Sequence, residues 1–197
     1  MKRPKVNVDL RPFFLNEARG HQRKSIIVLH ETVSHDRPGT GDITSVASFM
    51  DSTGLEIHGI IDQEANSGWC FDRRAIYDHT ASGSCGVNSK SVGFEQVSDI
   101  PLLSGNTARK KAWDPRGPRR KQLLKVAEWC AWLSASEGIP LVYSDGTKPG
   151  ITSHWSVSEA CLGGDGHWDC KPVHKGGHYP ILYVIRKAQQ ILEGGEL

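Results

Sequence analysis

The sequence predicts a single α/β domain built on a mixed central β-sheet flanked by helices. Three observations lead to this fold class. The chain has 197 residues, a length that suits one domain. Apolar, β-branched runs typical of buried strands alternate with longer stretches whose apolar residues recur at helical spacing. No internal repeat or interdomain linker interrupts the alternation, which favours one sheet covered by helices.

The strand predictions rest on short apolar segments bounded by turn residues. Residues 25–29, SIIVL, form a continuous apolar run, and we expect a buried strand with His30 at its end. Residues 91–97, SVGFEQV, alternate apolar and polar side chains and predict a half-buried strand that ends near Glu95. We predict four further strands, at 57–62, 68–71, 75–79 and 141–144.

Three stretches have helical periodicity. We predict helices over about 43–52, 118–136 and 180–192. Asp42 suits the N-cap of the first, and Gly138 ends the second. Two segments are rich in turn residues instead, and we expect loops at 104–120, which is basic, and at 145–178.

Charge and hydropathy narrow the class of protein. The formal net charge is +2, so composition gives no reason to expect nucleic acid as a partner. No apolar run approaches the roughly 20 residues of a membrane helix, so we expect no membrane span. The stretch MKRPKVNVDLRPFFLNEARG is basic but lacks the apolar core of a secretory signal. The sequence therefore predicts a protein made in the cytoplasm without a signal peptide.

The chain has five cysteines, an odd number. They are Cys70, Cys85, Cys130, Cys161 and Cys170. An odd count in a chain of this length favours reduced thiols over a disulfide framework.

The segment GHWDCKPVH, residues 166–174, concentrates side chains that can bind zinc. They are His167, Asp169, Cys170 and His174. His30, at a strand end, can point out of the sheet into a cleft, and His154 lies in a glycine-bounded loop upstream of Asp169. Such a set suits a catalytic zinc ion, which takes three protein ligands and keeps its fourth position open. Spacing alone does not distinguish a zinc site from histidines that have only a structural role.

Four motifs occur in order along the chain: SIIVLHETVS, IHGIID, DHTASGSCGVNSKSVGFEQV and ITSHWSVSEACLGGDGHWDCKP. Together they resemble type 2 N-acetylmuramoyl-L-alanine amidases, the zinc amidases related to peptidoglycan recognition proteins and common in phage endolysins. The resemblance runs from about residue 25 to 175. It implies an N-terminal extension at 1–24 and a zinc amidase catalytic domain at 25–197.

The resemblance also implies roles for individual residues. One catalytic zinc ion is held by His30, His154 and Asp169. Glu95, in the strand motif, acts as the general base. Other branches use a tyrosine at the position of Ile57, which rules that variant out here. His167 occupies the position of the family's oxyanion-stabilising lysine, and a histidine can give such help only in a pH-dependent way.

The substrate implied by the resemblance is the amide bond between N-acetylmuramic acid and L-alanine in peptidoglycan. His79, in YDHTASG, is expected to bind the muramyl-peptide stem or to orient a neighbour, and Asn88 is assigned to substrate binding. Zinc polarises such a carbonyl, and a carboxylate can carry the proton from water to the leaving amine. We expect a monomeric phage endolysin, made in the host cytoplasm and acting on the cell wall.

Two other classes of function stay open. A non-catalytic peptidoglycan-binding module on the same fold typically lacks the third zinc ligand, whereas Asp169 is present. Cys161, Cys170 and His174 have the spacing of part of a Cys/His nucleic-acid finger, and ARKKAWDPRGPRRK offers a phosphate-binding patch. A finger leaves the N-terminal candidate residues without a role, which favours the amidase.

Overall fold

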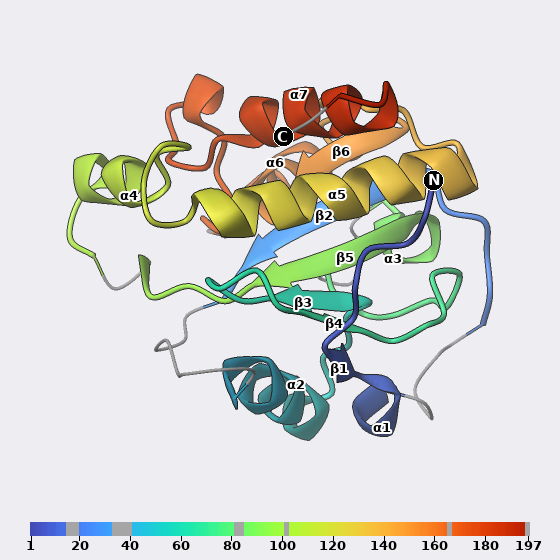
Figure 1. Cartoon of the computed structure of the whole chain (residues 1–197). Helices are drawn as coiled ribbons and strands as arrows, with labels where there is room; N and C mark the ends of the chain where they lie inside the picture. The colour runs from blue at the N-terminus through green and yellow to red at the C-terminus, as the bar shows by residue number, and fades with distance from the viewer. Residues whose placement is uncertain (15–19, 33–40, 81–84, 101–102, 165–166, 196–197) are drawn as a thin grey trace.

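Six short strands pair into one sheet at the centre of the molecule, in the order β1-β4-β3-β5-β2-β6 (Figure 1). The computed structural model describes residues 1–14, 20–32, 41–80, 85–100, 103–164 and 167–195. The strands of this described part are β1 (Val8–Asp9), β2 (Ile26–Glu31), β3 (Gly59–Ile61), β4 (Ser67–Trp69), β5 (Ser91–Gln96) and β6 (Gly150–Ser153). β3 and β4 pair antiparallel and all other neighbours pair parallel, so the sheet is mixed.

Helices cover both faces of this sheet (Figure 1). They are α1 (Arg11–Phe14), α2 (Gly41–Thr53), α3 (Val87–Lys90), α4 (Asn106–Ala112), α5 (Arg120–Glu137), α6 (His154–Leu162) and α7 (Ile181–Leu192), with a 3-10 turn η2 at Val173–Lys175. α5 and α7 share the larger apolar core with the sheet, and α1 and α2 enclose a second one. The predicted fold class, a single α/β domain with a mixed central sheet, is confirmed. Within the described residues, no helix combines the length and apolarity that crossing a membrane requires.

The pleat of β2 decides which way its side chains point. Ile27 and Leu29 enter the core formed with α5 and α7, whereas Ile26 and Val28 pack with side chains of α3 and α6. Successive side chains of a strand face opposite sides, so His30 points to the same face as Val28. This alternation fixes the face of the sheet on which the candidate ligands meet.

The strongest sequence patterns are the ones the structure confirms. The predicted strands at 25–29, 57–62 and 91–97 and the three predicted helices are present, with ends shifted by a few residues. The strand predictions at 75–79 and 141–144 are wrong, because these segments make isolated bridges and no strand. The predicted strand at 68–71 corresponds to β4, which begins one residue earlier.

Two predicted loops contain regular structure. The basic segment 104–120 contains α4, which buries no side chain and so has no apolar period to reveal it. The segment 145–178 contains β6 and α6, so the expectation that His154 lies in a loop is wrong. β6 is too short to show a period, and Ser153 switches the chain directly into α6 by accepting a hydrogen bond from the Ser156 amide.

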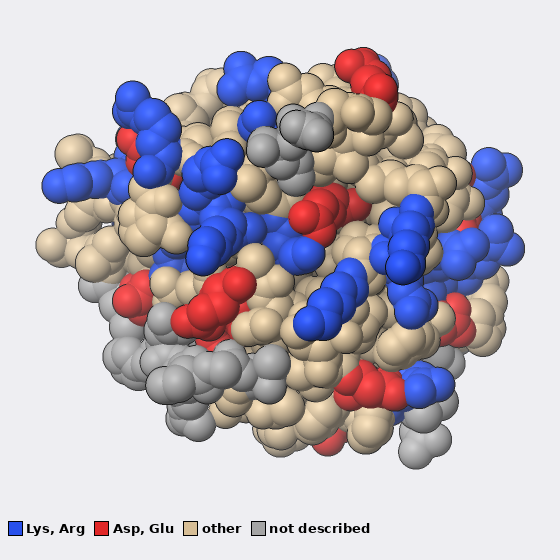
Figure 2. Space-filling model, in the orientation of Figure 1, with Lys and Arg blue, Asp and Glu red and all other residues tan. Residues whose placement is uncertain are grey.

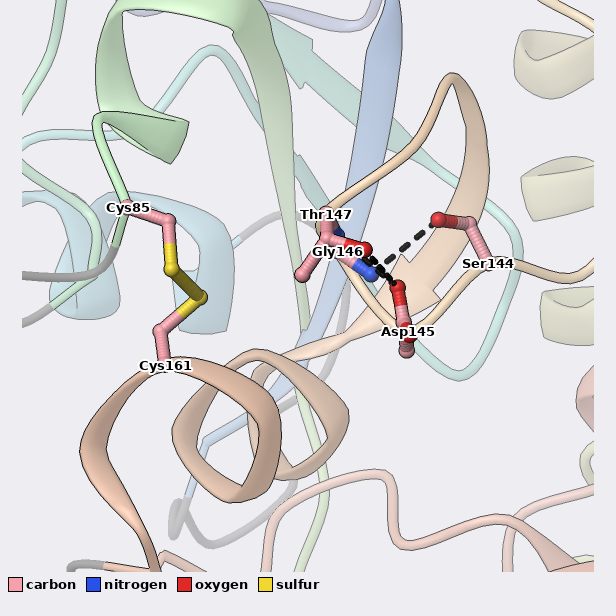
Figure 3. Close-up of a disulfide and its surroundings, with 6 residues drawn as sticks. All are labelled: Cys85, Ser144, Asp145, Gly146, Thr147 and Cys161. Atoms are coloured by element: carbon pink, nitrogen blue, oxygen red, sulfur yellow. Dashed lines mark hydrogen bonds between the residues drawn. A yellow bond between two sulfur atoms is a disulfide. The ribbon is translucent and has the colours of Figure 1, made fainter.

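Cys85 and Cys161 form a disulfide, with their Cα atoms 5.7 Å apart (Figure 3). The expectation that all five thiols are reduced is therefore wrong. Cys85 lies just before α3 and Cys161 lies on α6, and both helices pack against the same face of β2. Tertiary packing thus joins two cysteines 76 positions apart, which an odd count could not reveal. The other three cysteines are free and buried.

The segment before residue 25 contributes to the sheet and the core. β1 pairs with β4 at the sheet edge, and Leu10 and Phe14 belong to the apolar cluster with α2. The division of the chain at residue 24 stays a prediction, and these contacts show that the extension packs as part of the fold.

Candidate metal centre

Two of the three candidate ligands come from the ends of neighbouring parallel strands. His30 is the fifth residue of β2 and pairs in register with Glu95 of β5. On the other side of β2, Leu29 pairs with Ser153 of β6, so His154 follows at the same edge. The carboxyl ends of adjacent parallel strands are a recurrent position for functional sites in α/β proteins.

Asp169 reaches this edge from the loop after α6. Its carbonyl accepts a hydrogen bond from the Trp155 amide at 3.3 Å, which holds the loop against the start of α6. The next residue, Cys170, has a left-handed backbone (φ 53°), and its sulfur lies 3.4 Å from Nε2 of Gln96. Within GHWDCKPVH, Asp169 therefore joins the histidines and Cys170 belongs to the core.

The three donor atoms are spaced as a zinc ion requires. One oxygen of Asp169, Oδ2, lies 3.1 Å from Nδ1 of His154 and 3.5 Å from Nδ1 of His30. All three residues can bring a donor within 4.8 Å of the others. Ligand atoms of a tetrahedral zinc ion with bonds of about 2.0–2.1 Å lie about 3.3 Å apart. Two nitrogens and one oxygen are also a donor set that zinc accepts with a position left open. The residues present therefore fit the metal.

The protonation of these groups follows from burial and mutual contact. Burial lowers the pKa of His30 to about 4, which keeps its imidazole neutral and able to act as a ligand. Burial by itself raises the pKa of Asp169, but hydrogen bonds from His154, His167 and His30 outweigh it and hold that pKa well below its usual range. A neutral imidazole beside an ionised carboxylate is the state in which both bind metal.

The ring of His79 contacts the ring of His30. Nε2 of His30 lies 3.0 Å from Nδ1 of His79, and Nε2 of His79 lies 2.8 Å from the hydroxyl of Ser91. Burial and the neighbouring histidines hold the pKa of His79 well below its usual range, so the ring is neutral and can accept from one side while donating on the other. These contacts between His30, His79 and Ser91 leave Nδ1 of His30 available to bind a metal.

The residues of β5 that precede Glu95 make room for the ring of His79 and bind it. Ser91, Gly93 and Glu95 are alternate residues of β5 and share one face. A Cβ atom at Gly93 would lie 2.8 Å from Cγ of His79 and 2.4 Å from Cδ1 of Ile57. The glycine therefore makes room for the ring of His79, and the serine holds its far nitrogen. The sequence reading assigned no role to either residue.

Glu95 lies beside the candidate ligands without belonging to them. Its Oε1 is 4.0 Å from Nδ1 of His30, and its buried Oε2 has no hydrogen-bond partner within the described residues. Burial raises its pKa well above the usual range, and the negative charges of Asp169 and Glu31 act in the same direction. A carboxyl group with a raised pKa can hold and release a proton near neutral pH.

A cavity of about 430 Å³ joins these groups. Its walls are His30, Met50, Leu55, His79, Thr80, Glu95, His154, His167, Trp168 and Asp169. The ring of His167 packs against that of His154, tilted by 31° with ring centres 3.9 Å apart, and its Nδ1 lies 3.6 Å from Oδ1 of Asp169. Every predicted ligand and both predicted catalytic residues thus line one cavity.

The two predicted substrate-binding residues differ in whether they line the cavity. His79 lines the cavity, but both its ring nitrogens are already engaged. Asn88 does not line it: its side chain bonds the amide, hydroxyl and carbonyl of Thr80, which does. A direct role for Asn88 in substrate binding stays a prediction, and its contacts indicate that it shapes the wall through Thr80.

A buried network on the opposite face of β2 anchors the loop that carries Asp169. Glu31 accepts hydrogen bonds from the side chains of Ser98, Trp113 and His178, at 3.0, 2.8 and 2.8 Å. His178 belongs to the segment after Asp169, so this carboxylate ties that segment to the strand that bears His30. The sequence showed His178 only as a loop residue.

The ligands of the alternative Cys/His finger do not come together. Cys161 is bonded to Cys85, and the sulfur of Cys170 faces Gln96. The ring of His174 packs edge-on against Tyr143, with centres 4.6 Å apart. The three residues therefore do not form the part of a finger that their spacing suggested.

The comparison with protein families agrees with the geometry. Residues 21–172 match the family model described as N-acetylmuramoyl-L-alanine amidase. This match covers most of the chain, so the chain belongs to that family. No curated protein sequence matches the chain significantly.

Solved structures share the fold at low sequence identity. The Staphylococcus aureus hydrolase AmiA, in complex with its ligand, is 17% identical with a TM-score of 0.62, over 98% of this chain and 87% of that one. PlyL is 12% identical with a TM-score of 0.60, over 95% and 97%. The Ph2119 endolysin from the Thermus scotoductus MAT2119 bacteriophage Ph2119 is 16% identical with a TM-score of 0.51, over 91% and 89%. The resemblance predicted from the motifs is confirmed at the level of family and fold.

Proposed function

We propose that this chain is a zinc-dependent N-acetylmuramoyl-L-alanine amidase that cleaves the bond between N-acetylmuramic acid and L-alanine in peptidoglycan. The proposal rests on one observation: three side chains that can bind a metal line the same cavity as a carboxyl group that can hold a proton. Membership of the amidase family supports the bond chosen. The endolysins among the similar structures support a role in opening bacterial walls.

His30, His154 and Asp169 would hold the metal. The chemistry that zinc supplies at an open three-ligand site is polarisation of a carbonyl and acidification of water. His79 and Ser91 would fix the ring of His30, because a hydrogen bond to the outer nitrogen sets the tautomer of a histidine ligand.

Glu95 moves the proton in this scheme. Water adds to the scissile carbonyl carbon and loses its proton to the Glu95 carboxylate, which passes it to the nitrogen as the carbon–nitrogen bond breaks. The products are a lactyl carboxylic acid and a free L-alanine amine, and the acid's proton then passes to the amine to give a carboxylate and an ammonium group, so atoms and charges balance. The buried Oε2, which has no hydrogen-bond partner in the part of the chain that the structure describes, supports Glu95 in this role. His167 would donate to the carbonyl oxygen as negative charge develops there.

Digestion of purified peptidoglycan tests the proposal. Mass spectrometry should find stem peptides with new L-alanine amino termini after treatment with the wild-type protein and with Cys170→Ala, but not with Asp169→Ala. Cys170 is the matched control, because it is adjacent and buried but faces Gln96. Activity lost to a chelator should return with zinc. If wild-type protein binds these walls but releases no such peptides, the non-catalytic module replaces the enzyme.

A further inference from the structure

One segment of the chain near the catalytic cavity is strongly basic. Residues 104–125 contain eight basic side chains and one acidic one, a formal charge of +7 in a chain whose total is +2. In Figure 2 one group of Lys and Arg side chains lies on the left, over α4 and the beginning of α5, and a second group lies on the right of the view. The rest of the chain is therefore net acidic, and the cations are a local feature that the amidase chemistry does not use.

A groove of about 470 Å³ runs between α4, the segment after it and α7. Lys110, Arg116 and Arg186 line it from these three parts of the chain, and Asp114 lines it as well. A neighbouring hollow of about 340 Å³ continues it, since both share Pro115, Val173, Pro180 and Tyr183 as walls. Together the two hollows are lined by apolar and aromatic side chains and by the cations Lys110, Arg116 and Arg186.

The cations are only partly neutralised. Asp114 pairs with Arg116, with its carboxylate 3.1 Å from Nε and 3.0 Å from Nη2. Within the described residues, Lys110 and Arg186 have no carboxylate within ion-pair distance. The groove thus keeps uncompensated positive charge, which attracts an anionic ligand.

The aromatic residues of the groove indicate what kind of anion fits. Arg186 and Lys187 place their charged groups 5.8 and 6.0 Å from the ring centre of Tyr183. Trp113 is buried and donates its indole N–H to Glu31. Single-stranded nucleic acid binds chiefly by stacking successive bases on open aromatic rings. Of these two rings only that of Tyr183, which is half-buried, is accessible from the groove. A chain of phosphates without bases suits the groove better.

The groove lies close behind the catalytic cavity. His178 lines the groove, Trp168 lines the cavity, and the two rings are 6.3 Å apart between centres. Arg109 lies over the ring of Trp168 at 5.5 Å, and the next residue, Lys110, lines the groove. A ligand in the groove would therefore be separated from peptidoglycan in the cavity by the side chains of His178 and Trp168.

We propose that this groove binds a phosphodiester polymer of the bacterial wall, of the polyol-phosphate type, and so holds the protein on its substrate. The proposal goes beyond the amidase function, because binding needs neither the metal nor hydrolysis. Each exposed cation near such a polymer is worth roughly 1 kcal/mol, which is about fivefold in affinity. Loss of three would then weaken binding about a hundredfold.

Fluorescence anisotropy with labelled poly(glycerol phosphate) tests this proposal. The groove variant carries Lys110→Glu, Arg116→Glu and Arg186→Glu. The control carries Lys2→Glu, Lys90→Glu and Lys148→Glu, three exposed lysines that do not line the groove. Both variants change the formal charge from +2 to −4. Lys110→Glu alone serves as a milder variant, and thermal unfolding reports whether each protein is folded.

Wild-type protein should bind in low salt, and binding should weaken as salt increases. We expect the groove variant to bind about a hundredfold more weakly, Lys110→Glu at least fivefold more weakly, and the control within about twofold of wild type. Equal losses in both triple variants would overturn the proposal in favour of a general charge effect. A single-stranded oligonucleotide that binds as tightly, with the same loss in the groove variant, would overturn it in favour of nucleic acid. Because this assay needs no hydrolysis, its result is separate from that of the peptidoglycan digestion.

Discussion

Nε2 of His30 lies 3.0 Å from Nδ1 of His79, and that contact makes a neutral histidine the support of a candidate zinc ligand. The ring of His79 is held in turn by the hydroxyl of Ser91 at 2.8 Å. Two residues that do not touch the metal position thus determine how the ring of His30 is oriented.

Ser91→Ala should weaken zinc binding about 10- to 100-fold, the usual effect of losing a partner behind a metal ligand. Chelator competition measures this affinity directly. Ser89→Ala is the control, because Ser89 lies in α3 and its hydroxyl donates to the exposed carbonyl of Gly86, not to His79. Gly93→Ala should weaken zinc binding too, because its Cβ would meet the ring of His79. Unchanged zinc affinity in both variants would show that His79 does not act through His30.

Glu95→Gln should lower kcat by about 10²- to 10⁴-fold while zinc binding stays within a few-fold of wild type. Glutamine keeps the shape of the side chain but cannot accept a proton. Peptidoglycan hydrolysis and chelator competition on the same preparations separate the two effects. Glu193→Gln, an exposed change at the end of α7, controls for loss of a charge. A parallel loss of zinc would make Glu95 a ligand instead.

His167→Ala should lower kcat by about 10²- to 10³-fold if its ring donates to the developing oxyanion. His167→Lys should restore much of that loss, because an ammonium group can donate at the same place. Steady-state kinetics on soluble muramyl peptide is the measurement. Full activity in the alanine variant would mean that His167 lines the cavity but has no catalytic role.

The ligand set could be predicted from the sequence because short motifs place His30, His154 and Asp169 at recognisable positions. The supports of the site could not. Ser91 and Gly93 act through a ring that comes from a loop, and Glu31 has partners from three separate segments. Such roles depend on which face of a strand meets which loop, and a single sequence does not contain that information.

The secondary-structure predictions failed where local signals are weak. α4 has no buried face, and β6 passes into α6 without a turn residue. Hydrophobic periodicity detects an element only when one face is buried over several turns or pleats. The long strands and helices of the core met that condition, and the short elements around the site did not.

The Cys85–Cys161 disulfide should contribute about 4 kcal/mol to the free energy of unfolding, the chain-entropy value for a loop of this length. Cys85→Ser and Cys161→Ser should each remove most of it, and the double variant should be no less stable than either single one. Denaturant unfolding with and without a reductant is the measurement. Additive losses in the double variant would mean that the two thiols act separately.

Lys24 is almost fully buried, and its ammonium group donates to the carbonyl of Ser89 at 3.2 Å. Burial lowers its pKa from 10.5 to about 8. The unfolded chain therefore binds this proton more tightly than the folded protein between pH 8 and 10.5. The folded state is penalised fully below pH 8, by as much as about 3 kcal/mol, and this penalty disappears as pH rises through that window.

Lys24→Met should therefore stabilise the protein at pH 7, by about 1–2 kcal/mol after loss of the hydrogen bond to Ser89. The advantage of the variant should shrink steadily from pH 8 to 10.5. Comparison with wild type is needed because burial raises the pKa of Cys70 and Cys130 to about 12, so both thiols lower stability above pH 9 in either protein. Denaturant unfolding across this range, with the exposed Lys90→Met as control, is the measurement. An advantage that stays constant with pH would mean that the Lys24 ammonium reaches water in the folded protein.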